Sequence, residues 1–107
     1  LANIKKRQGE FSEALVDFNK LIESHPNEAI LYNNRADLYL KLKQYDNATK
    51  DIDKALEINP DYLVALITKG EIYYDKGDYE NACKYFNLGI SKGFQKESIA
   101  TYLEKCK

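Results

Sequence analysis

Apolar side chains recur along the chain at helical spacing, in short blocks separated by polar turns. One block spaces its apolar residues i, i+4, i+7 and i+8, which places them on one helix face: Ala48, Ile52, Ala55 and Leu56. Pro26 and Pro60 each follow such a block and end it, because proline disfavours helical backbone in the residue before it. The pattern predicts helices over residues 1–8, 12–24, 29–42, 46–58, 63–76 and 80–92.

The chain also repeats itself with a period of 34 residues. Small residues share two columns of the repeat: Ala2, Ala36 and Gly70, then Ala14, Ala48 and Ala82. Small side chains at these columns would let two antiparallel helices approach closely, and aromatic residues would fill the space near the turn. Gly9 and Gly77 share a turn column, where we expect left-handed backbone.

A last apolar stripe follows the repeats. Residues 96–106 carry Ile99, Ala100, Tyr102 and Leu103, which predicts one more helix. Stacked repeats leave an apolar face at their open end, so we expect this segment to cover that face as a cap.

These columns resemble the tetratricopeptide repeat family. The best unit, residues 29–62, reads AILYNNRADLYLKLKQYDNATKDIDKALEINPDY, and a further unit spans residues 63–94. The first unit, residues 1–28, is expected to begin partway through its first helix. The resemblance implies one all-α domain, a right-handed α-solenoid of antiparallel helix pairs with about 2.5 repeats and a capping helix at residues 95–107. Because the chain starts at Leu1 and contains no Met, we expect a fragment of a longer, bacterial protein.

In this family the first helix of each unit lines a concave groove that binds peptides. Carried over by position, the resemblance implies a groove formed by Asn3, Lys6, Ile30, Asn33, Asn34, Asp37, Leu40, Val64, Ile67, Glu71 and Tyr74. The large apolar members lie on a face that helix pairing is not expected to bury. Asp37 and Glu71 favour a partner with basic residues and an apolar anchor.

One subclass of the family clamps the acidic EEVD tails of heat-shock chaperones. Asn3 and Asn34 match its two Asn positions, but Val64 and Thr68 stand where its third unit carries Lys and Arg. Charge-assisted hydrogen bonds are the strong part of such a site, so their absence disfavours a chaperone-tail partner.

Composition excludes several other functions. Sixteen Lys and Arg against 17 Asp and Glu give a net charge of −1, without the positive surface of a general nucleic-acid binder. No apolar run approaches the roughly 20 residues of a membrane span. A single histidine, His25, and two cysteines do not supply a metal site, and no glycine-rich phosphate loop is present, so we expect no metal and no cofactor.

Cys83 and Cys106 leave three alternatives open. Cys83 follows the packing residue Ala82, and Cys106 lies in the expected cap, so the two could approach each other. They would then be two half-buried thiols, a disulfide that ties the cap to the last repeat, or metal ligands.

We therefore expect a non-enzymatic scaffold that binds a peptide segment in its groove. The alternative is a structural piece of a longer solenoid that packs against its own chain or self-associates. The sequence does not fix the compartment, and both the cytoplasm and the cell envelope remain open.

Overall fold

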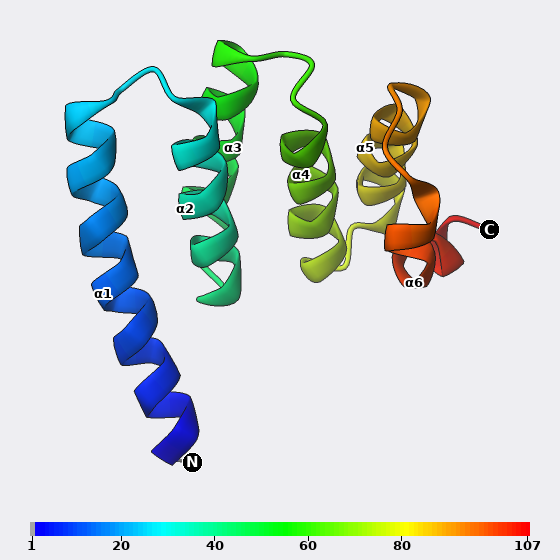
Figure 1. The fold of residues 1–107 in the computed structure, drawn as a ribbon. Helices are drawn as coiled ribbons and strands as arrows, with labels where there is room; N and C mark the ends of the chain where they lie inside the picture. The colour runs from blue at the N-terminus through cyan, green and yellow to red at the C-terminus, as the bar shows by residue number, and fades with distance from the viewer. Residues whose placement is uncertain (1) are drawn as a thin grey trace.

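A computed structural model describes the backbone of residues 2–107 and the side chains of residues 9–107. Five long helices are followed by a short helical cap: α1 (Ala2–Ser24), α2 (Ala29–Lys41), α3 (Tyr45–Ile58), α4 (Leu63–Asp75), α5 (Tyr79–Ser91), η1 (Lys96–Ile99), α6 (Ala100–Leu103) and η2 (Glu104–Cys106). The helices run antiparallel in a row, with α2 in front of α3, and the cap passes in front of α5 (Figure 1). The described backbone contains no strand, and the predicted all-α solenoid is confirmed.

Small residues sit at the contacts within each helix pair, as the repeat columns predicted. Ala36 and Ala48 are fully buried between α2 and α3, and Ala82 and Phe86 are fully buried in the pair formed by α4 and α5. A methyl group added at Gly70 would lie 2.6 Å from the Phe86 ring, so only glycine lets this ring approach α4 so closely.

The left-handed turn predicted at Gly77 is confirmed, and the turn before it shows the same backbone. Gly77 has φ +87°, and Lys43, at the equivalent place between α2 and α3, has φ 63°. The prediction was wrong at Gly9, because α1 continues through it without interruption from Ala2 to Ser24.

A charged network joins the first three helices. The Arg35 guanidinium on α2 donates to both carboxylate oxygens of Asp51 on α3, at 2.6 and 2.7 Å, and to Asn19 Oδ1 on α1 at 2.9 Å. Asp51 is buried, and its hydrogen bond with Arg35 raises the pKa of that guanidinium. The pair therefore has the fork geometry that makes Arg–carboxylate contacts specific.

The cap covers the end of the solenoid, but the single helix predicted over residues 96–106 was wrong. The backbone departs from helical geometry at Ile99 (φ −122°, ψ 24°), which separates η1 from α6. This bend buries Ile99 beside Phe86 and brings Tyr102 and Leu103 onto the α4–α5 pair. Packing therefore shapes this segment more than its helical period does.

Of the three alternatives for the cysteines, the structure contains the disulfide. Cys83 on α5 is bonded to Cys106 in η2, with a sequence separation of 23 residues. The bond fixes the end of the chain to the last helix pair.

Removal of this disulfide should destabilise the domain. Replacing Cys83 and Cys106 together with Ser should lower the free energy of unfolding by about 2–4 kcal/mol, because the unfolded chain regains the freedom that the loop restrained. Thermal denaturation with and without a reducing agent measures the effect. A reducing agent should destabilise the parent chain and leave the double variant unchanged, and equal melting temperatures in all four samples would contradict a formed bond.

Two glycines should respond in opposite directions to the same substitution. Gly70→Ala should destabilise the domain by roughly 1–3 kcal/mol, because its methyl group collides with the buried Phe86 ring. Gly9→Ala should stabilise it by up to about 1 kcal/mol, because nothing lies within 4 Å of the new methyl group and alanine favours helix. Chemical denaturation measures both, and a destabilised Gly9→Ala variant would show that the backbone turns at Gly9.

Candidate functional site

The expected groove residues on α2 and α4 differ widely in exposure. Ile30 and Val64 are 52% and 46% exposed, and Asn34 is also exposed. The members of the stripe toward the C-terminal ends of α2 and α4 are half-buried: Asp37, Leu40, Glu71 and Tyr74. The side chains of Asn3 and Lys6 lie outside the part of the chain that the structure describes.

Two members of the stripe are buried, which the sequence pattern did not predict. Ile67 is 4% exposed and packs against α5 at Gly89, where an added methyl group would lie 2.7 Å from Ile67 Cδ1. Ile67 is thus a core residue and is not available to a partner in this structure. Asn33 is also 4% exposed, and its buried Oδ1 has no hydrogen-bond partner among the side chains that the structure describes.

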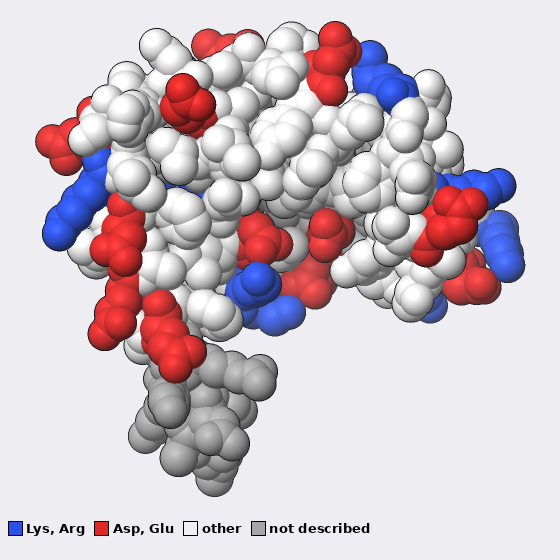
Figure 2. All heavy atoms as spheres, viewed as in Figure 1, with Lys and Arg blue, Asp and Glu red and all other residues white. Residues whose placement is uncertain are grey.

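A hollow of about 420 Å³ lies where the ends of α2 and α4 meet the cap. Its lining combines four expected groove residues with four that the sequence did not assign to the groove: Asp37, Leu40, Glu71 and Tyr74, then Lys41, Lys43, Asp75 and Tyr102. In Figure 2, acidic and basic side chains gather at a recess over the C-terminal ends of α2 and α4, below an uncharged middle of the same face.

Two of the carboxylates at this hollow have a basic partner. Asp37 pairs with Lys41 at 2.9 Å. Asp75 accepts hydrogen bonds from Lys43 Nζ at 2.8 Å and from the Tyr45 hydroxyl at 2.6 Å, which lower its pKa.

Glu71 differs from both. Its carboxylate accepts a hydrogen bond from the Tyr102 hydroxyl at 3.4 Å, which is long for an O–H donor. Burial, and then the nearby charge of Asp37, raise the pKa of Glu71, while the Tyr102 bond and Lys41 offset a smaller part. The hollow thus holds a half-buried carboxylate whose charged form is disfavoured.

Tyrosine rings form one wall of the hollow. Tyr74 meets Tyr102 of the cap edge to face, with ring centroids 4.8 Å apart, and meets Tyr79 at 5.0 Å. Tyr102 also packs on Phe86 of the core, at 5.3 Å. The cap therefore contributes a side chain to the site as well as covering the core.

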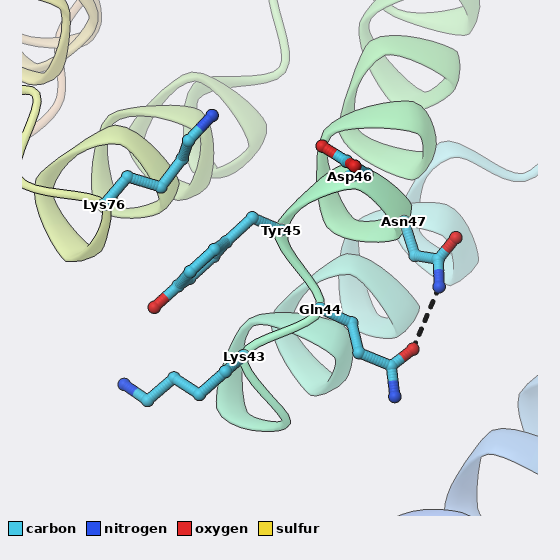
Figure 3. A pocket seen from close by; sticks show the side chains of 6 residues that line it. All are labelled: Lys43, Gln44, Tyr45, Asp46, Asn47 and Lys76. Atoms are coloured by element: carbon cyan, nitrogen blue, oxygen red, sulfur yellow. Dashed lines mark hydrogen bonds between the residues drawn. The ribbon is translucent and has the colours of Figure 1, made fainter.

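Another hollow, of about 470 Å³, lies at the turn between α2 and α3. Figure 3 shows Lys43 and Tyr45 extending to one side of this turn, and Gln44 and Asn47 to the other. Gln44 accepts a hydrogen bond from Asn47 at 2.9 Å. The side chains that line this hollow do not converge on a common point, so we assign no site to the hollow.

The described residues offer no metal site and no membrane span. No group of three His, Cys, Asp or Glu side chains in that part of the chain could hold a metal ion. No helix there combines the length and apolar character needed to cross a bilayer.

Comparisons with known proteins point to one family. Family models described as tetratricopeptide repeat match residues 1–28, 29–62 and 63–91. No curated protein sequence matches the chain.

Solved structures share the fold at low sequence identity. The first TPR of Spaghetti (RPAP3), bound to the HSP90 peptide SRMEEVD, is 24% identical, with a TM-score of 0.81 over 97% of this chain and 83% of that chain. The TPR2B domain of yeast Sti1, in a complex with pHsp70, is 23% identical, with a TM-score of 0.82 over 96% and 87%. YrrB, described as a TPR protein with an unusual peptide-binding site, is 29% identical, with a TM-score of 0.74 over 83% of this chain and 48% of that chain.

Glu71→Gln should raise the stability of the unliganded protein at neutral pH. The raised pKa means that the folded state holds the Glu71 proton more tightly than the unfolded state, so the charged form opposes folding. The difference from the parent chain should be full above the folded-state pKa, and should shrink as the pH falls toward the ordinary value of 4.5. Thermal melts between pH 4 and 7 measure it, and a destabilised Gln variant at pH 7 would contradict this account.

Proposed function

Because the chain belongs to the tetratricopeptide repeat family, we propose that it is a protein-interaction module whose groove along α2 and α4 binds a peptide segment of a partner. One observation carries the proposal. Side chains near both ends of the stripe on these two helices stay exposed or half-buried after helix pairing, and those at the C-terminal ends line the 420 Å³ hollow.

The composition of the stripe suits a peptide with an apolar anchor. Ile30 and Val64 are about half exposed, although most large apolar side chains of α2 and α4 are buried or half-buried. The exposed Asn34 amide can both donate to and accept from a peptide backbone. The buried Asn33 Oδ1 has no hydrogen-bond partner among residues 9–107, which is costly in a folded protein and calls for an explanation such as a functional role.

An acidic chaperone tail suits this groove less well. Three similar structures, of RPAP3 TPR domains that are 24%, 26% and 24% identical to this chain, hold peptides that end in EEVD. Here Val64 is apolar, and Thr68 is buried with its hydroxyl donating to the Val64 carbonyl at 2.9 Å. Neither can pair with a carboxylate, so we propose a partner with basic and apolar residues in its place.

A second candidate role is packing against a further helix or a second copy. On α1, Val16 and Leu21 are 51% and 45% exposed, which leaves apolar surface at this end of the solenoid. This role and peptide binding use different faces, so variants can separate them.

A display selection of random peptides against the full chain tests the proposed groove. Val64→Arg should weaken binding of the selected peptides by about tenfold or more, because it places a charge in the apolar stripe. Leu88→Arg on α5 is the matched control, since Leu88 is also exposed, at 39%, and lies outside the groove. It should leave affinity unchanged.

The peptide SRMEEVD is the second probe. We expect no binding at concentrations that saturate the selected peptides. Binding of SRMEEVD by the parent chain would contradict the preference for a basic partner. Selected peptides that bind Val64→Arg as tightly as the parent chain would contradict the groove.

A further inference from the structure

Charges around the 420 Å³ hollow do not balance. Three carboxylates and two amines line it. Lys41 pairs with Asp37 at 2.9 Å, and Lys43 pairs with Asp75 at 2.8 Å. Among the described side chains, no Lys or Arg pairs with Glu71, so one negative charge is left without a counter-ion.

This charge is also poorly solvated. Glu71 is half-buried, beside Asp37, and its hydrogen bond from Tyr102 is long at 3.4 Å. A carboxylate withdrawn from water is costly unless it is paired and hydrogen-bonded. The position therefore lacks a cation, and the hollow beside it has room for one.

The walls of the hollow fit a side chain that is apolar along its stem and positive at its end. Leu40, Tyr74 and Tyr102 give apolar and aromatic surface. Lys and Arg bury their methylene stems on such surface, and aromatic rings attract their charged ends. A free metal ion fits less well, because no group of three metal-ligating side chains occurs in the described residues.

We propose that this hollow binds the charged end of a Lys or Arg side chain of the partner, with Glu71 as its counter-ion and Tyr74 and Tyr102 as its walls. The inference rests on the proposed peptide-binding function. It specifies that one residue of the bound peptide is basic. It also gives the cap a part in recognition, because Tyr102 lies outside the repeats and is placed by the packing of the cap on α4 and α5.

A double-mutant cycle tests the proposal. The ligand is a selected peptide, with each of its basic residues replaced in turn by norleucine, and the protein variant is Glu71→Gln. At one peptide position, norleucine and Glu71→Gln should each weaken binding by about tenfold, as loss of a charge-assisted contact does, and the two together should weaken it little further. Replacing the same position by Arg or Lys then distinguishes the two cations.

Glu57→Gln on α3 is the matched control, because the Glu57 side chain is 73% exposed and lies outside the hollow. It should bind all peptides as the parent chain does. Strictly additive losses at every position, or equal losses for Glu71→Gln and Glu57→Gln, would overturn the cation pocket. If Val64→Arg abolishes binding while Glu71→Gln does not, the result supports the peptide groove and contradicts the cation pocket.

A small probe tests the pocket even if no peptide uses the groove. Nα-acetyl-lysine amide, added to the full chain at millimolar concentration, should shift the ring resonances of Tyr74 and Tyr102. Nα-acetyl-norleucine amide should not shift them, and Glu71→Gln should abolish the response to the lysine probe. Equal responses to both probes would contradict the pocket.

Discussion

The close approach of two helices within each pair is the constraint on which the rest of the structure depends. It requires small residues at the contact, and the chain supplies Ala36 and Ala48 in one pair, and Gly70 and Ala82 in the next. Because the contact uses one face of each first helix, the opposite face of α2 and α4 is left for other contacts. The same constraint that builds the solenoid therefore creates its free surface.

The cap completes the proposed site at the ends of α2 and α4. The disulfide between Cys83 and Cys106 ties the end of the chain to α5, and the bend at Ile99 places Tyr102 between Phe86 and Tyr74. In the proposed function, one segment therefore serves both stability and recognition. A further repeat would place a regular helix against α4 and α5. The irregular cap places the Tyr102 side chain there.

The repeat pattern predicted what depends on periodic packing, and missed what depends on single contacts. Helices α2 to α5 and the left-handed Gly77 follow from columns that recur. The uninterrupted helix at Gly9 does not, because sharing a column with Gly77 does not impose the same backbone on Gly9. Burial of Ile67 depends on the glycine at position 89, and the hollow depends on Tyr102, which belongs to no column.

The central claim is that the free face of α2 and α4, together with the cap, binds a partner. Mapping of backbone amide shifts by NMR, on the full chain with a selected peptide, tests it most directly. The account predicts that the largest shifts fall on α2, α4 and residues near Tyr102, with α3 and α5 little changed. Shifts concentrated on α1, or on the outer faces of α3 and α5, would contradict it.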